Sequence, residues 1–255
     1  MSTESYIIDG ARSPIGTKNG QMVGVRSDDL TAQVIQGLMK RNENVPSEAV
    51  EDVVVGCAFP EGPQGMLMAR SISVLADLPI ESGAKIVNRF CGSSMDSVHQ
   101  LSQAILAGDI DTGIAGGVED MFGVPMGGFN PSFNPELYEK EFYIGMGETA
   151  EILAKDLDIS REDQETFAVK SHEKALDAIE GGRYDNEIIP AQVNGTEVSK
   201  DEGPRTPDLD KIRSLDPAFD TDGTITAATS SPISVGAAAA IIMGDSKAKE
   251  LGLSP

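Results

Sequence analysis

The sequence of 255 residues has no tryptophan, only two histidines and two cysteines, and 20 basic residues against 41 acidic ones. Two cysteines allow at most one disulfide, which excludes a small secreted domain held together by disulfides. The histidines and cysteines are too scattered to match the ligand spacing of a zinc site. No apolar run approaches the ~20 residues needed to span a bilayer, so the sequence indicates no membrane span.

The formal net charge of −21 carries no clustered stripe of lysine or arginine. This balance excludes nucleic acid and an anionic membrane surface as partners. The acidic residues are spread along the whole chain, which leaves two interpretations open. They could simply keep the protein soluble, or they could reflect adaptation to high salt.

The start of the chain does not resemble a targeting signal. Residues 1–5 carry no basic stretch, and Tyr6-Ile7-Ile8 is typical of a first strand rather than of a signal peptide. Because a cytoplasmic chain normally keeps its cysteines reduced, we predict a cytoplasmic protein.

Strand and helix patterns alternate through the first half. Predicted strands cover 5–9, 52–58, 85–90 and 112–116, and the run of valines in the second indicates burial on both faces. Predicted helices cover 28–39, with Ser27 as its N-cap, 65–78, and a segment from Cys91-Gly92-Ser93-Ser94 to Ala107. This alternation predicts an α/β fold in which helices cover a sheet.

The middle of the chain has a different character. Residues 123–141 are rich in Gly, Pro, Asn and Phe and predict an ordered loop. Polar helices are predicted over 147–157 and 160–180, the second with Ser160 and Asp163 in a capping-box arrangement. Residues 194–217 are predicted as a surface excursion, followed by strands over 224–227 and 237–243 and a helix from 246.

Cys91 is the strongest candidate for a catalytic residue in the sequence. It lies where a predicted strand meets a predicted helix, so backbone N–H groups and the helix dipole would favour its thiolate. The same N–H groups could accept an oxyanion formed during acyl transfer. From the residues alone, a lone cysteine after a strand is also compatible with packing as a small hydrophobic side chain, as we expect for Cys57. His99 would lie about 12 Å further along the helix axis, too far to act as its base.

The residues around Cys91 resemble the nucleophile segment of the thiolases, especially the degradative 3-ketoacyl-CoA thiolases of β-oxidation in fatty acid metabolism. Further segments resemble the same family in the same order along nearly the whole chain. These segments are Asn88-Arg89-Phe90-Cys91-Gly92-Ser93-Ser94-Met95, residues 9–16, 116–121, 146–151, 159–164, 215–219 and 224–231.

The resemblance implies a fold: a layered α/β half with a mixed sheet covered by helices. Residues 1–121 and 218–255 would form this core, and 122–217 would form an inserted loop domain. It also implies self-association into a homo-oligomer.

The resemblance further implies an activity and its residues. Cys91 would accept an acyl group from acyl-CoA as a thioester, with coenzyme A as substrate and no cofactor. Ser231, Phe219 and Met146 match positions that line the bound coenzyme A or substrate. Arg205 lies one residue from a position that faces the nucleotide. We therefore predict an acyltransferase that cleaves 3-ketoacyl-CoA to acetyl-CoA and a shortened acyl-CoA, or runs the reverse Claisen condensation.

Thiolases have a second, similar half, which supplies a histidine, a second cysteine and an asparagine to the site. None of these matches a position in this chain, so we expect the second half to be absent and to be supplied by further chain or by a partner. The alternative is a non-catalytic subunit that binds acyl-CoA or assists assembly. The decarboxylating condensation of ketosynthases fits less well, because their nucleophile segment differs.

Overall fold

A computed structural model describes residues 2–253, and residues 1, 254 and 255 of the predicted core lie outside this range. The chain forms two compact units. Unit 1 comprises Met1–Phe129, Asp185–Glu202 and Ile233–Pro255, and unit 2 comprises Asn130–Tyr184 and Gly203–Pro232. These boundaries differ from the predicted insert over 122–217, because 122–129 and 185–202 belong to the sheet-bearing unit and 218–232 belongs to unit 2. The predicted division into domains stays a prediction.

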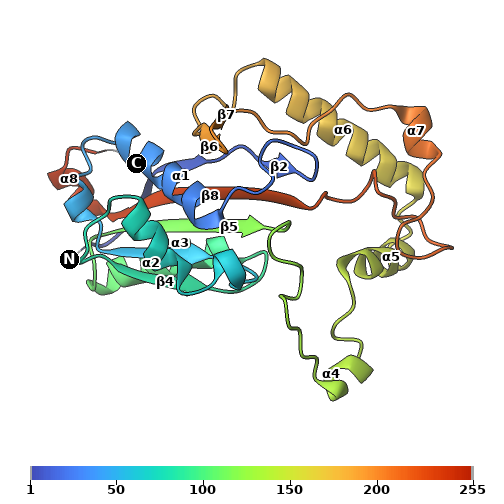
Figure 1. Ribbon diagram of the computed structural model, residues 1–255, viewed down its shortest axis with the longest axis horizontal. Coiled ribbons are helices and arrows are strands. Elements are labelled where there is room, and N and C mark those ends of the chain that lie inside the picture. The colour runs from blue at the N-terminus through green and yellow to red at the C-terminus, as the bar shows by residue number, and fades with distance from the viewer. Residues whose placement is uncertain (1, 254–255) are drawn as a thin grey trace. The chain divides into compact units, whose positions relative to one another are not determined.

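A mixed sheet forms the centre of unit 1, in the order β1-β8-β5-β3-β4 (Figure 1). β3 pairs in parallel with β4 and β5, whereas β8 pairs antiparallel with β1 and β5. The short β2 also pairs with β8. The mixed sheet predicted for the fold class is therefore confirmed. The strands span Ser5–Arg12 (β1), Gly16–Thr17 (β2), Asp52–Gly56 (β3), Gly83–Val87 (β4), Thr112–Asp120 (β5) and Ser234–Gly244 (β8).

Helices cover both faces of this sheet. α1 (Ser27–Arg41) and α2 (Met68–Leu75) pack on one face, and α3 (Ser93–Ala107) packs on the other. The valines of β3 show the division, since Val53 and Val55 join the α1 cluster while Val54 joins Leu101 of α3. All three valines are fully buried, as their unbroken apolar run predicted.

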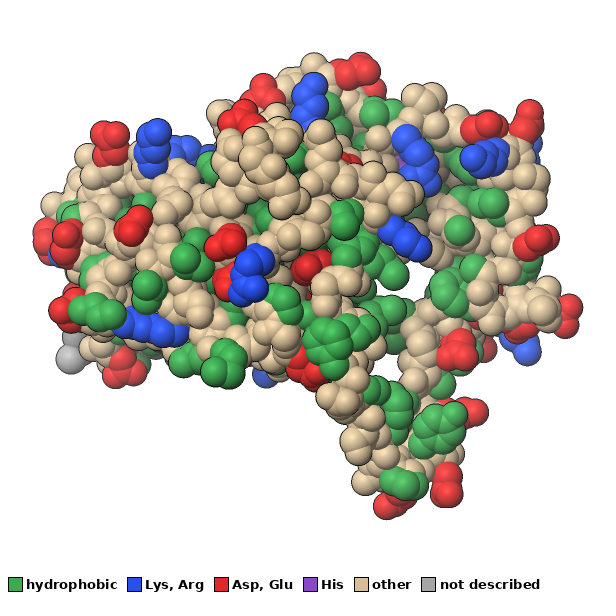
Figure 2. All heavy atoms as spheres, in the orientation of Figure 1, with side chains coloured by type: hydrophobic (Ala, Val, Ile, Leu, Met, Phe, Trp, Pro, Cys, Tyr) green, Lys and Arg blue, Asp and Glu red, His purple; other side chains and the backbone are tan. Residues whose placement is uncertain are grey.

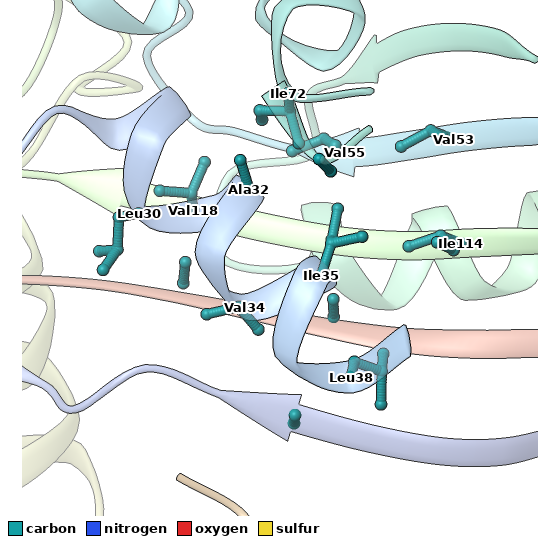
Figure 3. Packing of buried hydrophobic residues seen from close by; sticks show 14 of the residues in the cluster. Leu30, Ala32, Val34, Ile35, Leu38, Val53, Val55, Ile72, Ile114 and Val118 are labelled. Atoms are coloured by element: carbon teal, nitrogen blue, oxygen red, sulfur yellow. The ribbon is translucent and has the colours of Figure 1, made fainter. Parts of the chain in front are cut away.

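α1 is held by an apolar stripe at helical spacing. Leu30, Val34, Ile35 and Leu38 are all buried, and Figure 3 shows them on successive turns of α1 within one hydrophobic cluster. Burying one such side chain contributes about 1.5–3 kcal/mol, so this stripe is a main source of stability for the α1 face.

The other elements of unit 1 are short. The 3₁₀ turns η1 and η2 span Ser47–Ala49 and Gly62–Gln64, and α8 spans Asp245–Glu250. β6 (Ala191–Val193) and β7 (Thr196–Val198) form a hairpin that the sequence reading missed. Its turn is Asn194-Gly195, where both residues have positive φ. This dipeptide between alternating residues is the signal that could have predicted it.

Unit 2 is mainly helical. It contains α4 (Pro135–Glu139), α5 (Met146–Asp156), α6 (Arg161–Glu180) and α7 (Leu209–Arg213). The predicted cap of α6 is confirmed, because the Ser160 side chain accepts a 3.1 Å hydrogen bond from the Asp163 N–H. The Asp163 carboxylate accepts from the Ser160 hydroxyl and not from its N–H, so the arrangement is only part of a capping box.

Two local predictions were wrong. Ser27 does not cap α1, since it is the first helical residue, buried, with its hydroxyl directed to Gln64. Residues 224–227 do not form a strand. The carboxylate of Glu151 accepts from the N–H groups of Thr224 and Ile225 instead, so this backbone pairs with a side chain rather than with a sheet. No helix within residues 2–253 is both long and apolar enough to cross a membrane.

Candidate active site

Cys91 lies in the loop between β4 and α3, two residues before the first helical residue. Its thiol is free and exposed. The placement at a strand-to-helix junction confirms the position predicted from the sequence. Arg89 and Asp96 form a 3.4 Å ion pair across this loop and the first turn of α3. The negative charge of Asp96 in that turn also suits the positive end of the helix.

The loop is held in a tight conformation immediately before Cys91. Phe90 has φ of 45°, in the left-handed region that non-glycine residues rarely adopt. Its carbonyl accepts a 2.6 Å hydrogen bond from the Ser93 hydroxyl, and its N–H donates to the Asn88 side chain at 3.0 Å. The Ser93 hydroxyl also accepts from the Arg89 N–H at 2.8 Å. Side chains on both sides therefore fix the backbone that presents Cys91.

Glycines allow the start of α3 to lie directly on the sheet. A Cβ at Gly56 would stand 2.5 Å from the carbonyl carbon of Ser93 and the nitrogen of Ser94. A Cβ at Gly117, the residue paired with Gly56 on β5, would meet the Ser94 hydroxyl. Gly56 therefore needs to be glycine because it faces backbone atoms, whereas at Gly117 the opposing atoms belong to the Ser94 side chain.

A carboxylate lies under the loop that follows β3. Glu119, near the end of β5, accepts hydrogen bonds from the Ala58 N–H at 2.7 Å and from the Gln64 side chain at 2.8 Å. The thiol of Cys57 is 3.8 Å from the same carboxylate. Burial, with the nearby negative charge of Glu119, raises the pKa of Cys57 to about 12. Cys57 is therefore a protonated, buried thiol, in agreement with the packing role predicted for it.

The other predicted site residues lie in unit 2. Met146 is the exposed first residue of α5, and the ring of Phe219 packs on the next residue, Gly147, where a Cβ would be 2.2 Å from the ring. The structure thus brings Phe219 and the start of α5 together. Ser231 is exposed in the last segment of this unit.

Arg205 is exposed, and its N–H donates to the His172 Nδ1 at 3.3 Å. Partial burial and the positive charge of Arg205 lower the pKa of His172. Within residues 2–253, no hydrogen bond or ring contact joins Arg205 or Ser231 to Phe219 or Met146.

A base for Cys91 is not visible among the described residues. In the range 2–253 no side chain hydrogen-bonds to the Cys91 thiol, and His99 of α3 is exposed. Over the same range, no group of three or more His, Cys, Asp and Glu residues could hold a metal ion. The site therefore consists of a rigidly presented thiol at a helix N-terminus.

The sequence alone assigned no function to Asn88, Ser93, Gln64 and Glu119. The hydrogen bond between Gln64 and Glu119 joins residues 55 positions apart in sequence, so no local pattern reveals it. Only Asn88 and Ser93 offered a signal, because short polar side chains beside a helix start commonly hydrogen-bond the local backbone.

Together, the mixed sheet with helices on both faces and the cysteine before α3 define an α/β protein with an exposed thiol at a strand-to-helix junction. Comparison with known proteins then specifies the family. Residues 5–246 match the model of the thiolase N-terminal domain, and the chain belongs to the thiolase family.

Several similar curated relatives carry the name 3-ketoacyl-CoA thiolase. The chain is 43% identical over 269 residues to that of Bacillus subtilis (strain 168), covering 99% of this chain and 68% of the relative. It is 44% identical over 262 residues to the 3-ketoacyl-CoA thiolase of Alcanivorax borkumensis, covering 98% of this chain and 66% of the relative. The identity to the 3-ketoacyl-CoA thiolase of Shigella sonnei is 39% over 264 residues, covering 98% of this chain and 67% of the relative. The chain thus spans about two thirds of the length of these relatives.

Proposed function

We propose that this protein is an acyltransferase that carries its acyl group as a thioester on Cys91. Its reaction is the thiolysis of a 3-ketoacyl-CoA to acetyl-CoA and a shortened acyl-CoA, or the reverse Claisen condensation. The observation that carries the proposal is the exposed Cys91 thiol, held at the start of α3 in a chain of the thiolase family. The names of the relatives support the substrate class.

In the degradative direction, the Cys91 thiolate attacks the C3 carbonyl of the 3-ketoacyl-CoA. The C2–C3 bond breaks, and the released acetyl-CoA enolate takes up a proton, leaving an acyl thioester on Cys91. The thiolate of free coenzyme A then attacks this thioester and releases the shortened acyl-CoA with the Cys91 thiolate restored. The N–H of Cys91 has no acceptor among residues 2–253, so it is available to the developing oxyanion.

This chemistry needs a base for Cys91 and an acid for the enolate. We propose that both come from a part of the thiolase that these 255 residues do not include, either further chain or a partner chain. The absence of a side-chain partner for Cys91 within residues 2–253 supports this. An apolar depression of about 340 Å³ beside α3, lined by residues that include Gly10, Ser94, Val98 and Ala240, offers a surface for that part to cover.

Coenzyme A binding is assigned to unit 2. Ser231, Phe219 and Met146 expose a hydroxyl, an aromatic ring and a thioether, which suit the amide and methylene groups of pantetheine. We assign Arg205, which is exposed, to the nucleotide end, where a cation suits phosphate.

Self-association is part of the same proposal. β4 is an edge strand of the sheet, with one side unpaired within unit 1. Close to its two ends in sequence, Phe90 and Ile80 expose 64% and 70% of their surface. An unpaired edge with apolar neighbours favours a second copy of the chain, and we propose a homo-oligomer on this basis. The free thiols suit the reducing cytoplasm.

One observation favours a second candidate function. Because no side chain within residues 2–253 activates Cys91, the chain could bind acyl-CoA without reacting, as a binding or assembly subunit. The test is turnover of acetoacetyl-CoA and coenzyme A by the protein purified from its own cells with whatever chain accompanies it. The acyltransferase proposal predicts turnover that Cys91→Ala abolishes. Tight binding of the substrate without turnover would favour the binding subunit.

A further inference from the structure

The carboxylate of Glu119 belongs to a polar cluster that fixes the loop after β3. Gln64 is fully buried, and its side-chain N–H groups donate to Glu119 and to the Phe59 carbonyl, both at 2.8 Å. Its carbonyl oxygen accepts from the Asp120 N–H at 2.6 Å. The amide therefore cannot turn over without losing these bonds, and Glu119 must present an acceptor to it.

From this cluster, hydrogen bonds continue to the residue before the nucleophile. Glu119 accepts from the N–H of Ala58 at 2.7 Å, and the carbonyl of Ala58 accepts from the Asn88 side chain at 2.8 Å. The Asn88 oxygen in turn accepts from the Phe90 N–H at 3.0 Å. The rings of Phe59 and Phe90 also contact each other, with centroids 5.9 Å apart.

We propose that Glu119 is a positioning residue for Cys91, acting through Ala58 and Asn88 on the backbone of Phe90. The inference rests on the proposed function for what Cys91 does, but not for the relay itself. Phe90 has a φ of 45°, a conformation that persists only where the surroundings impose it. Without the relay, Phe90 relaxes, and the thiol and the N–H of Cys91 lose their placement together.

A carboxylate is required at this position. Glu119 accepts from two donors, the Ala58 N–H and the Gln64 side chain, and approaches a third, the Cys57 thiol. In Glu119→Gln, whichever way the amide turns, its NH₂ group opposes either the Ala58 N–H or the Gln64 NH₂. The variant thus breaks one contact of the relay while changing the side chain's volume very little.

The experiment follows two readouts in the full-length protein. The first is amide hydrogen exchange of the segment 88–92, and the second is the single-turnover rate of acetyl transfer from acetyl-CoA to Cys91. Glu119→Gln is expected to speed exchange in this segment and to slow acetyl transfer at saturating acetyl-CoA by about 10- to 100-fold. Asp120→Asn is the matched control, because within residues 2–253 its carboxylate accepts hydrogen bonds only from the Phe122 and Gly123 N–H groups, and it should leave both readouts unchanged.

A double variant separates positioning from general damage. Asn88→Asp keeps the acceptor for Phe90 but sets an oxygen against the Ala58 carbonyl, so it breaks the relay at its next link. If both residues act through one relay, Glu119→Gln/Asn88→Asp is no slower than the slower single variant. Rate losses that multiply would overturn the proposal.

Unchanged amide hydrogen exchange of residues 88–92 in both Glu119→Gln and Asn88→Asp would also overturn the proposal, whether or not acetyl-CoA acylates Cys91. If the wild type takes up no acetyl group, the proposed function fails, and the exchange measurement alone decides on the relay. If Glu119→Gln does not fold, Glu119→Asp replaces it with the same expectations, because it withdraws the carboxylate by one methylene.

Discussion

Gly56 lies so close to Ser94 that a Cβ on the glycine would stand 2.5 Å from the serine nitrogen. The contact packs the end of β3 against the first turn of α3. Because Cys91 lies just before that turn, the contact also fixes how far Cys91 lies from the sheet. Because the opposing atoms are backbone, a side chain at this position cannot be accommodated by a rotamer change.

Gly56→Ala is therefore expected to push the start of α3 off the sheet. Misplacement of a reacting group by about 1 Å can cost about 100-fold in rate, so acyl transfer should fall by one to two orders of magnitude. Gly116→Ala is the matched control, since a Cβ there would have its nearest neighbours at an ordinary 3.5 Å. Single-turnover rates of both variants check this, and equal rates would contradict the role given to Gly56.

The two cysteines are expected to differ sharply in reactivity. Cys91 is exposed, whereas Cys57 is 1% exposed with a pKa of about 12, so its thiolate is nearly absent at pH 8. Iodoacetamide at pH 8 should alkylate Cys91 in the native protein and leave Cys57 untouched until the protein is denatured. Peptide mapping checks this, and early alkylation of Cys57 would show that the loop after β3 opens.

Much of unit 1 follows from local sequence patterns. The valine run of β3, the apolar stripe of α1 and the strand-to-helix junction at Cys91 were all predictable, because periodicity and turn residues specify them locally. The hydrogen bonds of Glu119 and Gln64 were not, since they join residues 55 positions apart through the sheet. The missing strand at 224–227 has the same cause: a distant carboxylate, Glu151, replaces the sheet partner.

Arg12 and Asp201 form a two-pronged ion pair at 2.7 and 2.9 Å, with 22% and 11% of their side chains exposed. Asp201 also accepts from the Ile15 N–H, so it fastens the loop after β1. Asp201→Ala should lower the free energy of unfolding by about 1–3 kcal/mol, because it removes two charge-assisted hydrogen bonds from the partly buried Arg12 and the acceptor of the Ile15 N–H. Lys140→Ala, which breaks an exposed pair with Glu136, should cost at most about 0.5 kcal/mol. Equal effects in urea unfolding would contradict this reading.

The acidic surface offers a test of salt adaptation. Asp and Glu side chains are dispersed over the face shown in Figure 2 and outnumber Lys and Arg, in line with the net charge of −21. Lowering KCl from about 1 M to about 0.1 M lengthens the Debye length from about 3 to about 10 Å. The electrostatic repulsion between the surface carboxylates is then screened less. If the protein is salt-adapted, its Tm falls on this dilution. An unchanged Tm would leave solubility as the role of the acidic residues.

The most direct test of the central claim is the intact mass of the full-length protein, with any chain that accompanies it, after brief incubation with acetyl-CoA. A thioester on Cys91 predicts a mass increase of one acetyl group, located on the peptide that contains Cys91, removed by added coenzyme A and absent in Cys91→Ala. No adduct, or an adduct that persists in Cys91→Ala, would contradict the account.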